Sequence, residues 1–167
     1  MNIYIACSLT HVPREHFERH VEFIQKIAGL LSEEFGANIK YALKDSDPQL
    51  AEEVFETQAR LCYLWDRNMV ENADLIIAEA SYPSTGLGIE LQIAEHKKIP
   101  VILLFRDQAE CKAPPVEYTD INGKHSLQIG EGYISLMALG MPNVSNVFSY
   151  TTQEDAFHAI RQYLTTN

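Results

Sequence analysis

Short apolar runs alternate along this chain with segments of helical periodicity, and that alternation restricts the fold more than any other feature. The apolar runs are strand candidates, at residues 3–7, 39–43, 75–80, 101–105 and 144–150. Strands that alternate with helices need crossover connections, which produce a parallel sheet with helices on both faces. The sequence therefore predicts an α/β fold with a doubly wound, five-stranded parallel sheet.

The helical segments carry recognisable start and stop signals. The first begins near Pro13, which suits a first helical turn, and Gly36 suits its end. Its apolar residues recur at helical spacing: Phe17, Val21, Ile24, Ala28 and Leu31. Further helices are expected at residues 50–63, 66–73, 87–97 and 153–164, the last capped by Thr151 or Thr152.

Residues 107–132 interrupt this pattern. They contain two prolines and three glycines and show little periodicity. A long loop is expected there, serving either as a lid or as an oligomer contact. With this insertion, residues 1–167 are expected to form one domain.

Composition limits the environment and the partners. The chain shows no signal peptide and no apolar run long enough to span a bilayer, and its odd set of three cysteines favours a reducing cytoplasm. A formal net charge of -10 argues against DNA or RNA as a partner. A single nucleotide remains possible, because helix N-termini and hydroxyls can hold one phosphate.

Two acids suggest a site. Glu90 is expected in the first turn of the helix at residues 87–97, above the carboxyl end of a strand, where ligands bind in open α/β sheets. The helix N-terminus would hold its carboxylate ionised. With Asp66 as the second acid, the pair suits cleavage of a bond to a sugar's anomeric carbon. Each acid alone could equally be an ordinary helix-start residue.

Other motifs give weaker indications of function than the acid pair. Gly86 and Gly88 do not belong to a dinucleotide fingerprint, because its third glycine position is Leu91, but they would let a ligand approach Glu90 closely. Cys7 is expected as a small buried residue, with only His11 near it as a base.

Charged and histidine residues outside the acid pair also allow plain structural interpretations. His16 and His20 have the spacing of a metal pair but are expected on an outer helix face without a third ligand, so no metal is expected. Glu79 is expected as a solvated strand end. Arg14 could hold a phosphate or be a solvated charge.

Five segments together resemble the nucleoside 2-deoxyribosyltransferase superfamily. They are IYIACSLT at residues 3–10, Asp66 followed by NADLIIAE, then PSTGLGIEL, PVILLF and YISLMALG. The resemblance implies a flavodoxin-like fold, a homodimer or higher oligomer with shared active sites, and no metal or organic cofactor. It implies that Glu90 attacks the anomeric carbon, that Asp66 positions the sugar or passes a proton to the base, and that Tyr4 lies beside the glutamate.

Two serines indicate a branch of this superfamily. Transferases carry an acid six residues before the nucleophile and an asparagine in the segment equivalent to YISLMALG. This chain has Ser84 and Ser135 there, which resembles the 2′-deoxynucleoside 5′-monophosphate N-hydrolases. An acid at residue 84 would repel a 5′-phosphate, whereas hydroxyls can donate to it. That branch has Gly in place of Cys7 and Arg in place of Thr10, and Arg14 is the candidate substitute.

The resulting expectation is an N-glycosidase that acts on a small nucleotide. Ser8, Ser84 and the partner subunit's Ser135 would bind the phosphate. A deoxyribosyltransferase that passes the sugar to a second base is the alternative. A non-catalytic nucleotide sensor is a third possibility, against which the presence of both Asp66 and Glu90 argues.

Overall fold

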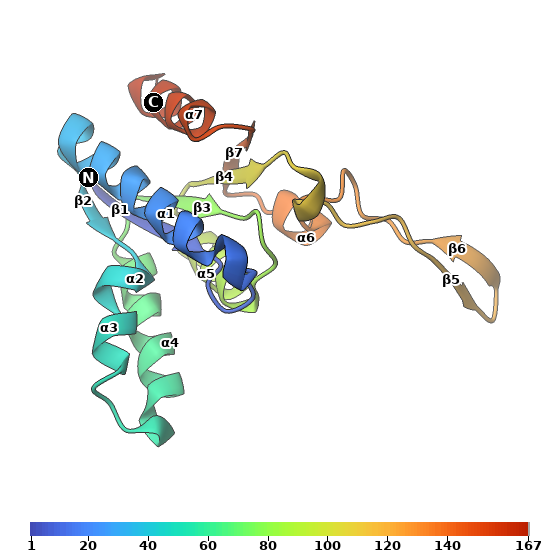
Figure 1. The fold of residues 1–167 in the computed structure, drawn as a ribbon, viewed down its shortest axis with the longest axis horizontal. Coiled ribbons are helices and arrows are strands. Elements are labelled where there is room, and N and C mark those ends of the chain that lie inside the picture. The colour runs from blue at the N-terminus through green and yellow to red at the C-terminus, as the bar shows by residue number, and fades with distance from the viewer. Residues whose placement is uncertain (167) are drawn as a thin grey trace.

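A five-stranded parallel sheet forms the centre of the fold (Figure 1). The structure is a computed structural model that describes residues 1–166. The strand order is β2-β1-β3-β4-β7, which is the order of a flavodoxin-like sheet and confirms the predicted fold class. The strands are β1 (Asn2–Cys7), β2 (Asn38–Lys40), β3 (Leu75–Glu79), β4 (Val101–Arg106) and β7 (Val144–Tyr150).

Helices cover both faces of this sheet. Successive strand residues point to opposite faces, so Ile3 and Ile5 of β1 pack on one side while Tyr4 and Ala6 pack on the other. On the Ile3 side lie α1 (Arg14–Phe35) and α7 (Gln153–Thr166), and on the Tyr4 side lie α4 (Phe55–Glu71) and α5 (Thr85–His96). Strands β3 and β4 are buried along their whole length, which explains their unbroken apolar sequences.

Several helix boundaries differ from the prediction. The helices expected at 50–63 and 66–73 are one continuous helix, α4, preceded by the short helices α2 (Ala42–Asp45) and α3 (Asp47–Leu50). The end of α1 is as predicted, because Gly36 adopts a left-handed conformation with φ 59°. The Thr152 hydroxyl accepts from the Asp155 N–H at 3.2 Å and so caps α7.

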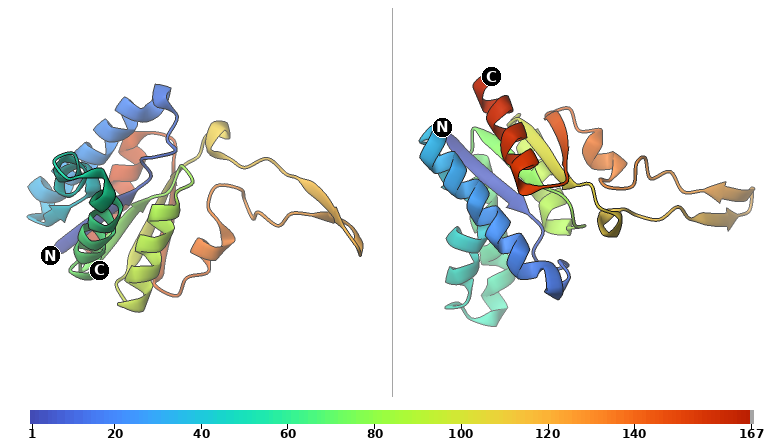
Figure 2. Two further views of the ribbon diagram at one scale, coloured as in Figure 1. Left: turned by 90° about the horizontal axis from the view of Figure 1, so that it is seen from below. Right: turned by 45° about the horizontal axis from the view of Figure 1, so that its top comes forward.

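Residues 107–132 form an arm rather than an unstructured loop. After a short 3₁₀ turn (Ala109–Cys111), β5 (Glu117–Asp120) and β6 (Gly123–Ser126) pair antiparallel, and α6 (Leu136–Leu139) follows. The hairpin projects far from the central sheet (Figures 1 and 2). The prediction missed it because both strands are short and mostly polar, so their apolar pattern is weak.

Within the described part of the chain, residues 1–166, no helix is both long and apolar enough to cross a membrane.

Candidate active site

Tyr4 and Glu90 are in direct contact on the α4 and α5 side of the sheet. Tyr4 comes from the middle of β1 and is 1% exposed. Its hydroxyl donates to Glu90 Oε1 at 2.6 Å. Burial, and then the charge of Glu90, raise the pKa of Tyr4 well above its usual value, so the phenol keeps its proton and remains a donor. Tyr4 therefore lies beside Glu90, as expected.

The helix position and charge state of Glu90 differ from the expectation. Helix α5 begins at Thr85, so Glu90 lies in its second turn, beyond the reach of a first-turn effect. Burial raises the pKa of Glu90 to about 8, the Tyr4 hydrogen bond lowers it, and the charge of Asp66 raises it. The prediction that the helix N-terminus holds this carboxylate ionised is wrong, because desolvation dominates.

The two oxygens of the Glu90 carboxyl are inequivalent. Oε1 accepts from Tyr4, whereas Oε2 is buried and has no hydrogen-bond partner among residues 1–166. A carboxyl that is fixed through one oxygen keeps the lone pairs of the other for a ligand. This is the arrangement that a carboxylate nucleophile requires.

Asp66 is fixed in the middle of α4. Its Oδ1 accepts from the Ser46 hydroxyl at 2.6 Å, and its Oδ2 accepts from the Cys62 thiol at 3.4 Å. Its charge raises the pKa of both Glu90 and Tyr4, which shows that the three groups share one electrostatic environment. The alternative that Asp66 caps a helix is wrong. Sequence reasoning missed Ser46, which is 1% exposed, because it lies in an irregular stretch before α3.

Ser84 and Ser135 are both N-cap residues. The Ser84 hydroxyl accepts from the Leu87 N–H at 3.2 Å at the start of α5, and Ser135 accepts from the Met137 N–H at 3.2 Å at the start of α6. A capping hydroxyl acts as acceptor toward the helix, so its own hydrogen stays available to a ligand.

A cleft of about 940 Å³ brings Ser84 and Ser135 of one chain onto a common surface. It lies between α5, the base of the arm and α6, and Gly88 also lines it. Tyr4, Asp66 and Glu90 are not among its lining residues. The phosphate-binding role of the two serines, and the use of Ser135 by a neighbouring subunit, stay predictions.

The polar residues at the end of β1 and in the loop after it differ in their exposure to solvent. Ser8 is fully buried and its hydroxyl donates to the Tyr82 carbonyl, so in this arrangement its hydrogen points away from a ligand. Thr10 is exposed. Cys7 is half-buried, and desolvation raises the pKa of its thiol far above the usual value, which argues against a thiolate nucleophile.

Three further candidates are Arg14, Gly86 and Gly88. Arg14 is exposed at the start of α1, with its guanidinium 5.5 Å from the centre of the Phe17 ring. Gly86 and Gly88 belong to α5 itself rather than to a loop. A Cβ at Gly88 would meet no atom within 4 Å, so the space beside this glycine is open.

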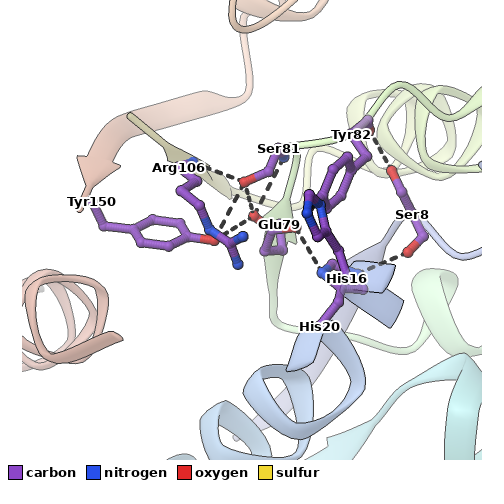
Figure 3. A network of polar contacts seen from close by, with 8 residues as sticks. All are labelled: Ser8, His16, His20, Glu79, Ser81, Tyr82, Arg106 and Tyr150. Carbon is purple, nitrogen blue, oxygen red and sulfur yellow. Dashed lines mark hydrogen bonds and ion pairs between the residues drawn. The ribbon is translucent and has the colours of Figure 1, made fainter. Parts of the chain in front are cut away.

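Two predictions about charged side chains on the other face of the sheet are wrong. Glu79 was expected in solvent and is 0% exposed, and His20 was expected on an outer helix face and is 1% exposed. His20 instead contacts the Ser8 carbonyl and faces Glu79 (Figure 3). Across residues 1–166, no group of three or more His, Cys, Asp or Glu side chains is arranged to hold a metal ion.

Comparison with known sequences gives partial matches. No family model matches the chain. It is 42% identical over 48 residues to "Putative 2′-deoxynucleoside 5′-phosphate N-hydrolase 1" of Syntrophotalea carbinolica. It is 36% identical over 72 residues to the protein of the same name in Methanosarcina mazei, and 32% identical over 81 residues to that of Methanosarcina barkeri. The matched segments span 34%, 44% and 50% of those relatives.

Comparison with solved structures covers nearly the whole chain. A CMP N-glycosidase of Clostridium botulinum superposes with a TM-score of 0.59 at 18% identity, over 98% of this chain and 99% of that one. A 2-deoxyribosyltransferase of Bacillus psychrosaccharolyticus superposes with a TM-score of 0.55 at 17% identity, over 94% and 90%. At such identities the superpositions establish the fold. The partial sequence matches are similarities to proteins named as N-hydrolases, and they span half or less of those relatives.

Proposed function

We propose that this protein is an N-glycosidase that hydrolyses the bond between base and sugar in 2′-deoxynucleoside 5′-monophosphates. The observation that carries the proposal is the Glu90 carboxyl, which is held through Oε1 by the Tyr4 hydroxyl at 2.6 Å while Oε2 has no hydrogen-bond partner among the described residues. Asp66 contributes a second carboxylate to the same electrostatic environment. Two neighbouring acids with different surroundings are the groups that cleavage at an anomeric carbon uses.

The reaction follows in two steps. Ionised Glu90 attacks the anomeric carbon through Oε2, the carbon–nitrogen bond to the base breaks, and the base leaves with its electron pair and takes a proton. Water then attacks the same carbon, the bond to Glu90 breaks, and the water proton is lost, which yields deoxyribose 5-phosphate and free Glu90. Asp66 stabilises the positive charge that develops on the sugar.

The phosphate is the reason for choosing a nucleotide over a nucleoside. The Ser84 hydroxyl caps α5 and keeps a hydrogen to donate, and the first N–H groups of α5 lie beside it. The partial relatives are named as 5′-phosphate N-hydrolases, and the superposed CMP N-glycosidase also acts on a nucleotide. We place the activity in a reducing cytoplasm, in keeping with three free cysteines.

We also propose that the enzyme works as a homodimer or a higher oligomer. Met137 of α6 is 84% exposed and Leu136 is 48% exposed, beside the cleft that holds Ser84 and Ser135. A second copy that covers these side chains would bring the partner subunit's Ser135 to the phosphate.

Incubation with a panel of substrates tests the function. The panel holds dGMP, dCMP, CMP and deoxyguanosine, each with and without free adenine, and chromatography measures released base and sugar phosphate. We expect base release from the deoxynucleotides and none from the Glu90→Gln variant. Formation of a new nucleoside with adenine would establish the transferase instead. Binding of nucleotide without turnover would establish a sensor.

A further inference from the structure

A buried polar network on the α1 side of the sheet has no part in the reaction proposed above. It joins the ends of β1, β3, β4 and β7 to α1, and its centre is Glu79, which faces His20 (Figure 3). Both side chains are almost completely shielded from solvent. A buried carboxyl and a buried imidazole cost folding free energy unless their hydrogen-bonding groups are satisfied, so their donors and acceptors can be counted.

One oxygen of Glu79 is fully used. Its Oε1 accepts from the Ser81 N–H at 3.3 Å, from the Ser81 hydroxyl, and from the Tyr150 hydroxyl at 2.7 Å. The Ser81 hydroxyl in turn accepts from the Arg106 N–H at 2.8 Å. Glu79 Oε2 has no partner and lies 3.6 Å from His20 Nδ1, which also has no partner among the described residues.

The hydrogen bond of His20 Nε2 determines the protonation state of Nδ1 in the neutral imidazole. His20 Nε2 lies 2.9 Å from the Ser8 carbonyl oxygen, which can only accept, so Nε2 carries a hydrogen. A lone pair on Nδ1 would then face an ionised carboxylate in a site that excludes water, which is unfavourable. One additional proton removes the conflict, whether it lies on Nδ1 or on Glu79 Oε2.

This proton connects the loop after β1 with the segment before α5, where the proposed phosphate site begins. His20 holds the loop after β1 through the Ser8 carbonyl, and Glu79 holds the segment before α5 through Ser81. The Ser8 hydroxyl joins the two loops through the Tyr82 carbonyl. We infer that His20 and Glu79 share one proton and act as a positioning pair that holds the loop after β1 against the segment before α5, which leads to the proposed phosphate-binding Ser84. The link between these two segments follows from the contacts, and only its effect on phosphate binding rests on the proposed function.

The other ionisable groups around the pair keep their charge near neutral pH. Burial raises the pKa of Tyr150, Tyr82, Cys7 and Cys111, so these side chains remain neutral, and Arg106 remains a cation. The charge of Arg19 also acts on Tyr82. His16 lies one turn before His20 and contacts the Tyr82 hydroxyl at 3.0 Å, so it is the group that the experiment has to separate from the pair.

Nucleotide affinity is the first test. Glu79→Gln should bind dGMP with the wild-type Kd, since an amide donates to neutral Nδ1 without an extra proton. Glu79→Ala removes the partner of the Ser81 N–H and the group that faces His20 Nδ1, so its Kd for dGMP should be about tenfold weaker. His20→Phe should raise KM for dGMP by about tenfold with a smaller change in kcat.

Controls separate positioning from folding. His16→Gln should keep the wild-type affinity, because the polar contact of His16 is with the Tyr82 hydroxyl and not with Glu79. Melting curves should show that Glu79→Gln and His16→Gln are folded. A folded Glu79→Ala or His20→Phe variant with the wild-type affinity for dGMP would overturn the proposal, as would a loss of affinity in His16→Gln.

Nitrogen-15 NMR of the histidine rings tests the shared proton without any substrate. The wild type should show His20 Nδ1 either protonated or accepting a hydrogen bond, and Glu79→Gln should show Nδ1 only as an acceptor. A free, unbonded Nδ1 in the wild type would refute the pair even if the enzyme is a nucleotide hydrolase. If no nucleotide binds or reacts, the proposed function fails, while this measurement still decides the proton.

Discussion

Burial and hydrogen bonding have opposing effects on the charge of the Glu90 carboxyl. Burial favours its neutral form and raises its pKa to about 8, whereas the hydrogen bond from Tyr4 favours the ionised form. Only the ionised form is a nucleophile. The activity of the free enzyme should therefore depend on pH in a direction that these contacts fix.

We expect kcat/KM to rise with pH and to level off above about pH 8, because it reports ionisation in the free enzyme. Tyr4→Phe removes the hydrogen bond that lowers the pKa of Glu90, so the rise should move to higher pH. At about pH 7 this variant should lose about tenfold in kcat/KM, and more where the phenol also orients the carboxyl. A pH profile that does not move in Tyr4→Phe would contradict the assigned role of Tyr4.

Glu90→Gln should lose base release and gain stability. Because the pKa of Glu90 is higher in the folded protein than in the unfolded chain, its ionisation costs stability, and the cost grows as pH rises from about 4.5 to about 8. Gln cannot ionise. The variant should melt at least about 4 °C above the wild type at about pH 9 and close to it at about pH 4. A lower melting temperature at high pH would contradict the burial of a neutral carboxyl.

At the scale of elements, prediction from sequence succeeded where burial is uniform. Strands β3 and β4 are buried on both faces, so an unbroken apolar run identifies them. The arm hairpin was missed because β5 is exposed along its length and β6 is exposed at every second residue, and neither has an apolar face to reveal it. Glu79 and His20 were misplaced because charged residues are usually exposed, and the partners that allow their burial are distant in the sequence.

The N-terminus of α5 offers a substitution that separates capping from recognition. Aspartate caps helices as well as serine does, so Ser84→Asp should keep the melting temperature, whereas Ser84→Ala should cost about 1 kcal/mol. The new carboxylate would face the phosphate, so Ser84→Asp should erase a preference for dGMP over deoxyguanosine of about a hundredfold in kcat/KM. Equal use of both substrates by the wild type would favour the transferase.

At the scale of the whole molecule, the sheet with its helices buries its apolar side chains, whereas the projecting arm exposes several of them. Two apolar clusters fill the two faces of the sheet, one under α1 and α7 and the other under α4 and α5. The arm instead exposes Val116, Tyr118 and Leu127, each about half accessible, and Ile121 at its tip is fully exposed. A two-stranded ribbon is marginally stable by itself, so a second copy of the chain is the expected support.

Sedimentation of the purified protein should show at least a dimer. Met137→Glu should shift it toward the monomer with little change in melting temperature, because Met137 is 84% exposed in its own chain. Val54→Glu, at a side chain 63% exposed beside the start of α4, is the matched control and should leave assembly unchanged. A strictly monomeric and fully active wild type would contradict a shared active site.

Because side chains alternate along β1, the proposed catalysis depends on the register of this strand. Tyr4 reaches Glu90 only because it points to the α5 side, while Ile3 and Ile5 point to the α1 side. A shift of β1 by one residue against β3 would exchange these faces and place an isoleucine beside the carboxyl. Chains trapped in such a misaligned state would retain helices and a sheet yet release no base. Specific activity after refolding would thus count correctly aligned molecules, which circular dichroism cannot distinguish from their misaligned counterparts.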